Sequence, residues 1–154
     1  MKKIILAMVA VMVPLMLSAG STDFWFRHFS VEDGLSSSAV RAIMQDKYGF
    51  MWLGTDDGLN RYDGTTIKIY RLNPEGVNDY ISFLYDTTDR IWIGTGDGVY
   101  IYDYETENFE PFKLLTAKGD SIKTNVNHIA EDRDGNLWFS TVGQGTVSYT
   151  HLRA

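Results

Sequence analysis

Residues that could do chemistry recur at one fixed spacing in three places. In each place an Asp stands six residues before a Trp, and a Thr follows the Trp by three residues. The three sets are Asp46, Trp52 and Thr55; Asp86, Trp92 and Thr95; and Asp132, Trp138 and Thr141. An indole face can stack on the apolar face of a sugar, which would make these Trp residues a binding site. A binding residue rarely needs a copy in every repeat, so we instead predict that all three Trp side chains pack between neighbouring sheets.

Asp132-Arg133-Asp134-Gly135-Asn136 is similar to the start of a calcium-binding loop. An EF-hand loop needs Gly at its sixth position and Glu at its twelfth, whereas here Gly135 is fourth and the twelfth residue is Gly143. Asp46 and Asp86 occupy the same place in their repeats without further ligands, so we predict that all three Asp side chains cap turns. The sequence contains no Ser/His/acid grouping, phosphate loop or zinc spacing, so we predict no catalytic residue, no metal and no cofactor.

The elements that must position these residues are repeated β-strands. The Trp-to-Trp spacings are 92 − 52 = 40 and 138 − 92 = 46 residues, and a period in the forties made of short strands is typical of β-propeller blades. The repeats lie at about 40–72, 80–114 and 126–147. Known propellers have about four to eight blades. We therefore predict an all-β fold, a partial β-propeller of about three four-stranded blades that is truncated and not closed.

Each repeat is predicted to contain short strands separated by turns. The first strands are expected at Val40–Gln45, Tyr80–Tyr85 and Val126–Glu131, and the Trp-bearing second strands at Phe50–Thr55, Arg90–Thr95 and Asn136–Thr141. The third strands are expected at Gly58–Asp63, Gly98–Asp103 and Gly145–Tyr149, and the fourth at Thr66–Arg71 and Asn108–Lys113. The segment Phe24–Ser30 matches the fourth strands, which predicts an orphan outer strand before the first repeat.

The stretch from Val40 to Gly64 strongly resembles the two-component regulator propeller repeat, and the lead-in Glu32–Ser36 resembles the usual opening before its first blade. The repeat positions that carry the resemblance include Asp46, Trp52, Gly54, Asp86, Trp92, Gly94, Asp132 and Trp138. The resemblance implies the N-terminal part of the periplasmic sensor region of a hybrid two-component histidine kinase. Such a parent would be a homodimer in the inner membrane that senses glycan-derived ligands and signals to transcription.

The chain itself is predicted not to be an enzyme, because the kinase region of the resembled family is absent from the sequence. Two alternatives remain open at this point. One is a secreted propeller that serves as an interaction scaffold, and the other is a fragment of a carbohydrate-active propeller enzyme. The enzyme would need catalytic residues that converge on one face, and the sequence singles out none.

Propeller ligands generally bind at the face where loops lead into the innermost strands. The segments in question are Ser36–Arg41, Asn78–Ser82 and Thr124–His128, which vary between repeats while the Trp-bearing strand does not. Variable loops on a fixed frame are where specificity is expected. Charge, stacking and hydrogen bonding suited to an acidic or neutral oligosaccharide come from Arg41, Tyr80, Asn127 and His128. We predict that these four residues contact a ligand; the alternative is that they belong to solvated loops with a hydrogen-bonded histidine.

Residues 1–20 are predicted to be a cleaved signal peptide rather than part of the fold, with a plain membrane anchor as the alternative. Lys2 and Lys3 precede an apolar run of 14 residues, and small residues follow it. The propeller region is expected at 21–147 and a non-native tail at 148–154. Without residues 1–20 the chain holds 12 basic and 20 acidic residues, a net charge of −8 that argues against nucleic acid or an anionic membrane as partner. The absence of Cys excludes disulfides and thiolate metal sites.

Overall fold

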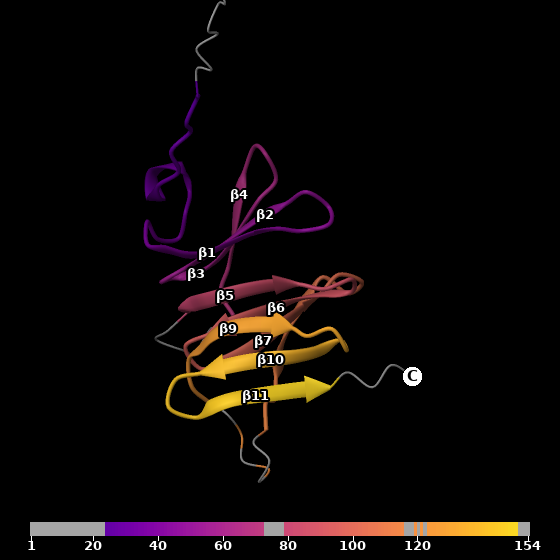
Figure 1. Cartoon of the computed structure of the whole chain (residues 1–154). Helices are drawn as coiled ribbons and strands as arrows, with labels where there is room; N and C mark the ends of the chain where they lie inside the picture. The colour runs from indigo at the N-terminus through magenta and orange to yellow at the C-terminus, as the bar shows by residue number, and fades with distance from the viewer. Residues whose placement is uncertain (1–23, 73–78, 116–118, 120, 122, 151–154) are drawn as a thin grey trace, which may run out of the picture.

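The computed structural model describes residues 24–72, 79–115, 119, 121 and 123–150. These residues form three antiparallel sheets that stack face to face (Figure 1). The all-β, unclosed propeller predicted from the repeats is thereby confirmed. The predicted signal peptide and the last four residues of the predicted tail lie outside the described residues. Within the described part of the chain, no helix is long and apolar enough to cross a membrane.

Each sheet is one blade, and the strands follow one another in chain order. Blade 1 contains β1 (Val40–Gln45), β2 (Met51–Thr55), β3 (Gly58–Tyr62) and β4 (Ile67–Tyr70). Blade 2 contains β5 (Ile81–Asp86), β6 (Arg90–Thr95), β7 (Gly98–Asp103) and β8 (Asn108–Phe112). Blade 3 contains β9 (Val126–Glu131), β10 (Asn136–Thr141) and β11 (Gly145–Thr150). A short 3₁₀ helix, η1 (Val31–Asp33), precedes blade 1.

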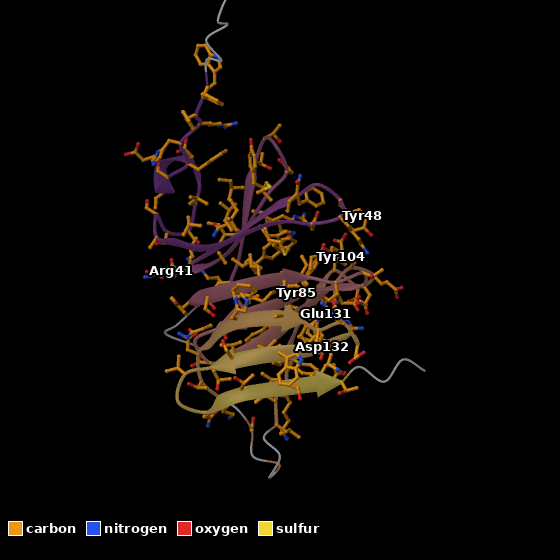
Figure 2. The ribbon with its side chains drawn as sticks, viewed as in Figure 1. Arg41, Tyr48, Tyr85, Tyr104, Glu131 and Asp132 are labelled. Carbon is orange, nitrogen blue, oxygen red and sulfur yellow. The ribbon has the colours of Figure 1, made fainter. Side chains whose placement is uncertain are left out.

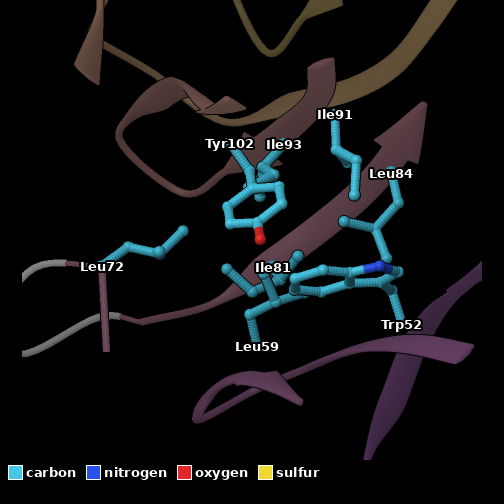
Figure 3. Close-up of a cluster of buried hydrophobic side chains, with 8 residues drawn as sticks. All are labelled: Trp52, Leu59, Leu72, Ile81, Leu84, Ile91, Ile93 and Tyr102. Atoms are coloured by element: carbon cyan, nitrogen blue, oxygen red, sulfur yellow. The ribbon is translucent and has the colours of Figure 1, made fainter. Parts of the chain in front are cut away.

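Two apolar clusters hold the blades together. The first lies between blades 1 and 2 around Trp52, with Ile81, Leu84 and Tyr102 on the opposing sheet (Figure 3). The second lies between blades 2 and 3 around Trp92. Trp52 is 0% exposed and Trp92 3% exposed, so the predicted packing between sheets holds for both. Burial of large aromatic side chains contributes strongly to such interfaces.

Trp138 differs, because 44% of its surface is exposed. Trp52 and Trp92 each face the blade that follows their own in the chain: the Trp52 ring centroid lies 5.1 Å from that of Tyr102, and the Trp92 centroid 5.9 Å from that of Tyr149. No described residue forms a blade after blade 3. Among the described residues, the prediction that Trp138 is packed between sheets is therefore not met, because none of them forms a sheet on its outer side.

The Gly two residues after each of the first two Trp side chains allows the next blade to approach. A Cβ at Gly54 would lie 2.5 Å from Cγ2 of Ile81, and a Cβ at Gly94 would lie 2.7 Å from the carbonyl oxygen of Val126. Both distances are too short for any side chain. Blade 3 has Ser140 at this position, where no described strand lies against it.

The Thr of each set caps the turn that follows the Trp-bearing strand. The Thr55 hydroxyl donates to the carbonyl of Gly58 over 2.9 Å, and the Thr95 hydroxyl donates to the carbonyl of Gly98 over 3.1 Å. The Thr141 hydroxyl donates to the carbonyl of Gly145 over 2.7 Å. A hydroxyl three residues after the Trp thus satisfies a backbone acceptor in a tight turn.

The orphan strand predicted at Phe24–Ser30 does not form, and the described residues of this segment have no regular secondary structure. A fourth strand needs a third strand beside it to share its backbone hydrogen bonds, and no described residue pairs with this segment as a strand. At the other end, β11 extends to Thr150, three residues past the predicted end of the propeller region at 147.

Candidate functional site

The blades present two opposite edges to solvent, and Figure 2 shows both. Arg41 lies at one edge, whereas Tyr48, Tyr104, Tyr85, Glu131 and Asp132 lie at the other. We call the first the strand-start edge; it is formed by the segments leading into β1, β5 and β9. We call the second the hairpin edge; it is formed by the turns at 46–50, 87–90 and 132–136.

At the strand-start edge, Arg41 is paired with an acidic side chain. Its Nε and Nη2 donate to the two carboxylate oxygens of Asp56 over 2.7 and 3.0 Å. This pairing lowers the pKa of Asp56 and raises that of Arg41. The guanidinium also lies 5.7 Å from the Tyr80 ring centroid, within the range of a cation–π contact. The structure therefore brings Arg41 and Tyr80 together, with Asp56 as a third member that the sequence interpretation did not include.

A second guanidinium lies at the same edge. Arg71 donates to both carboxylate oxygens of Asp57 and to its backbone carbonyl, and it lies 4.0 Å from Asp79. These groups are exposed, apart from the nearly buried carboxylate of Asp79. Sequence reasoning missed this pair because Arg71 lies at the end of a fourth strand, far from Asp57 in the chain.

His128 and Asn127 are both exposed at the start of β9. The imidazole packs on Phe83 of β5, with ring centroids 4.3 Å apart, so its position is set by the contact between blades 2 and 3. The structure shows no contact of either residue with Arg41 or Tyr80. The four predicted ligand residues thus divide into a pair between blades 1 and 2 and a pair at the start of blade 3. Their role in binding remains a prediction.

At the hairpin edge, two of the three repeated Asp side chains accept a hydrogen bond from the indole of the Trp in the same repeat. Trp52 Nε1 donates to Asp46 over 2.7 Å, and the backbone N–H groups of Tyr48 and Phe50 donate to the same carboxylate over 2.9 Å each. Asp132 accepts from Trp138 Nε1 over 2.8 Å and from two backbone N–H groups in the same way. Each carboxylate therefore joins a turn to an indole.

The middle repeat does not follow this rule. Thr87 N donates to the carbonyl of Arg90, whereas in blade 1 the corresponding bond runs from Asp46 N to Phe50. The hairpin of blade 2 is one residue shorter, because Asp89 stands where the other repeats have a Gly with positive φ. The first strand consequently shifts to Ile81–Asp86 instead of the predicted Tyr80–Tyr85. Thr87 now occupies the place of the capping Asp.

Because of this shift, Asp86 does not cap the turn, and that prediction is wrong. Its carboxylate accepts from the hydroxyl of Tyr104 over 2.9 Å, and burial raises its pKa. Burial and the same hydrogen bond raise the pKa of Tyr104 well above its usual range. The indole N–H of Trp92 is left buried without a protein partner among the described residues.

A cleft of about 500 Å³ opens beside Trp92, between the hairpins of blades 2 and 3. Acidic groups in its lining are Asp86, Asp89 and Glu131. Arg90 is paired with Asp89 over 2.6 Å, and Glu131 accepts from the Tyr85 hydroxyl over 3.1 Å. The cleft thus offers one buried donor and several acceptors to water or a hydroxylated molecule. Among the described residues, no group of three or more His, Cys, Asp or Glu side chains could hold a metal ion.

We predict that acid weakens blade 3 through Asp132. Hydrogen bonds from Trp138 and Asn136 lower its pKa from 3.8 to about 2. A carboxyl with a lowered folded-state pKa contributes stability above the unfolded-state pKa and loses it as the pH falls through the folded-state value. The indole N–H resonance of Trp138 should therefore titrate with a midpoint near pH 2 and be nearly flat in an Asp132→Asn variant. A wild-type midpoint near pH 4 would show that the hydrogen bonds do not hold the carboxylate in solution.

The repeated blades, each with a Trp on its second strand, define an unclosed β-propeller array. Residues 34–57 and 121–143 of this array match the two component regulator propeller family. Over 59 residues the chain is 56% identical to Histidine kinase P4 of Formosa agariphila, which amounts to 38% of this chain and 4% of that protein.

Solved structures show the same relationship. The extracellular domain of the hybrid two component system BT3049 from B. thetaiotaomicron superposes with a TM-score of 0.65 at 27% identity, covering 81% of this chain and 20% of that one. The extracellular domain of BT4673 from the same organism gives 0.58 at 27% identity, covering 71% and 16%. The resemblance to the sensor region of hybrid two-component histidine kinases is thus confirmed. The chain spans a fifth or less of the length of these relatives.

Proposed function

We propose that this chain forms part of the ligand-sensing propeller of a hybrid two-component histidine kinase and works outside the cytoplasm. The observation that carries the proposal is the combination of propeller repeats with a fold shared with two extracellular sensor domains. The kinase activity belongs to the relative, and the described residues contain only the propeller strands and their loops. In this function the chain binds and does not catalyse.

We further propose a glycan-derived ligand at the strand-start edge. Arg41 and Tyr80 together offer a charged group beside an aromatic ring, which suits a sugar bearing hydroxyl or carboxylate groups. Asp56 holds the guanidinium in place and offers a hydrogen-bond acceptor. Ligand binding would change the signalling output only if it favours one arrangement of the receptor over another.

The test is a titration of the chain with neutral and uronate-containing oligosaccharides, in which backbone amide chemical shifts are monitored by NMR. We expect saturable shifts at Arg41 and Tyr80, lost in Arg41→Ala and Tyr80→Ala. The matched control is Lys47→Ala, which removes a cation that contacts an aromatic ring at the hairpin edge and should leave binding unchanged. Shifts confined to the hairpin edge, or their absence with every oligosaccharide, would refute the proposed site.

A further inference from the structure

The hairpin of blade 2 leaves a buried polar group without a partner. The indole N–H groups of Trp52 and Trp138 each donate to the Asp of their own repeat. Trp92 lies at the same register position in its sheet, but no described residue accepts from its N–H. The side chain is only 3% exposed. A buried donor of this kind is rare, and it costs free energy unless a ligand or water accepts from it.

The cleft beside Trp92 has the same local cause. Between blades 1 and 2, the Lys47 ammonium crosses from the first hairpin to the carbonyl of Thr88. Thr88 holds the position of Lys47 in blade 2, because Thr87 holds that of Asp46. A Thr side chain is much shorter than a Lys and leaves space before blade 3. The hairpins on both sides of this space lie within the described residues, so the cleft belongs to the boundary between blades 2 and 3.

The size of the cleft suits a small molecule. Its volume of about 500 Å³ falls within the range of small-molecule binding sites. The residues that line it come from the two facing hairpins and the strands beside them, and they include Thr87–Arg90, Trp92, Glu131, Gly135 and Leu137.

The charged groups of the cleft favour hydrogen-bond donors. The Arg90 guanidinium is paired with Asp89 over 2.6 Å, so these two charges largely cancel. Glu131 accepts from the neutral hydroxyl of Tyr85 over 3.1 Å, and both residues lie at the hairpin edge (Figure 2). An ionised carboxylate has about four acceptor sites, so Glu131 can accept further hydrogen bonds. The cleft therefore combines one buried donor with a net negative charge.

These two properties together select a hydroxyl group. An indole N–H can only donate, and an ionised carboxylate can only accept. A ligand cation would pair with Glu131 but offer no acceptor to Trp92. A ligand anion would accept from Trp92 but be repelled by Glu131. A hydroxyl both donates and accepts, so a neutral molecule with several hydroxyls can serve both groups at once.

We propose that this cleft is a second binding site, separate from the strand-start edge, for a small neutral molecule with several hydroxyl groups, such as a mono- or disaccharide. One hydroxyl accepts from Trp92 Nε1, in the place where an Asp carboxylate stands in the other repeats, and another donates to Glu131. The Nε1 atom is itself buried, so the ligand reaches it only when the turn at 87–90 shifts outward. The bound molecule then contacts the hairpins of both blades.

The test is a titration of the full chain with glucose, xylose and cellobiose, in which indole N–H and backbone amide resonances are monitored by NMR. We expect saturable shifts of the Trp92 indole N–H and of the amides of Thr88 and Gly135 with at least one of these sugars. The Trp52 indole N–H is the internal control, because it already donates to Asp46 and should not shift. Glucuronate, which adds a carboxylate, should cause much smaller shifts at the same concentrations.

Three variants locate the binding. Glu131→Gln should raise the Kd of the bound sugar by about 10-fold, the usual effect of losing a hydrogen bond to a charged group. Thr88→Lys places in blade 2 the side chain that crosses between blades 1 and 2 and should abolish binding by filling the cleft. Glu105→Gln is the matched control, since it removes an exposed negative charge from the turn after β7, outside the lining of the cleft. Circular dichroism of each variant checks that the blades remain folded.

The proposal fails if the Trp92 indole resonance stays in place with all three sugars, because the cleft then holds only water. Shifts at Arg41 and Tyr80 without shifts at Thr88 and Gly135 would support the strand-start site and overturn this second one. Glucuronate binding as tightly as the neutral sugars would overturn the ligand class. Unchanged affinity in Thr88→Lys would place the sugar outside the cleft and overturn the site.

Discussion

Replacing Trp52 with Ala is expected to lower the free energy of unfolding by about 3–5 kcal/mol, the usual cost of deleting a buried Trp. Trp52 is fully buried, and its ring lies within 6.4 Å of three aromatic rings on blades 1 and 2. The substitution also leaves the Asp46 carboxylate without its indole donor. Urea unfolding monitored by circular dichroism measures the effect.

Trp138→Ala is the matched control within the same chain. Trp138 has the same register and the same bond to an Asp, but it is 44% exposed because no described residue forms a blade beside it. Its loss should cost about 1 kcal/mol, because a half-exposed side chain leaves little cavity. Equal losses for the two substitutions would mean that contacts within a blade, and not between blades, give Trp52 its stabilising role.

The second large effect is expected from Gly94→Ala. The new Cβ would lie 2.7 Å from the carbonyl oxygen of Val126, 3.2 Å from the Ser82 hydroxyl and 3.3 Å from Cβ of Phe83. Two of these neighbours are held in place by the hydrogen bond that Ser82 donates to Val126. Overpacking against a rigid backbone costs about 1–3 kcal/mol, and here it pushes blade 3 away from blade 2.

Amide hydrogen exchange shows which blades lose stability in the Gly94→Ala variant. In Gly94→Ala, amides of β9, β10 and β11 should exchange faster, while those of blade 1 stay close to wild type. Gly96→Ala is the control, because its Cβ would meet nothing nearer than 3.8 Å and its φ is not positive. Uniform acceleration across all blades would show that the three blades unfold as one unit, contrary to a local separation of blade 3.

The repeat spacing predicted the fold because each blade is a local structure. Strand alternation and Gly-bearing turns fix one antiparallel sheet from about thirty consecutive residues, and the same pattern three times fixes the stack. The predicted register of blade 2 was wrong for a local reason as well. Asp89 replaces a Gly, and the hairpin is one residue shorter. A missing Gly at a positive-φ position was the available signal.

The exposure of Trp138 and the loss of the strand at 24–30 could not be predicted from the pattern. Both depend on a neighbouring blade, which no repeat can supply from its own sequence. The pairings of Arg41 with Asp56 and of Arg71 with Asp57 depend in the same way on how far apart the strands and turns lie in space. The sequence variation between repeats predicted the strand-start edge as the variable one, and the structure shows which groups pair with its arginines.

The most direct test of the sensing role uses an intact hybrid kinase whose first three blades are replaced by residues 24–150 of this chain. We predict that a transcriptional reporter driven by this chimera responds to the oligosaccharides that bind the isolated chain. The Arg41→Ala and Tyr80→Ala versions should lose that response while remaining folded and exported. If the chimera and its variants give the same reporter output with every oligosaccharide, this part of the propeller does not sense the ligand.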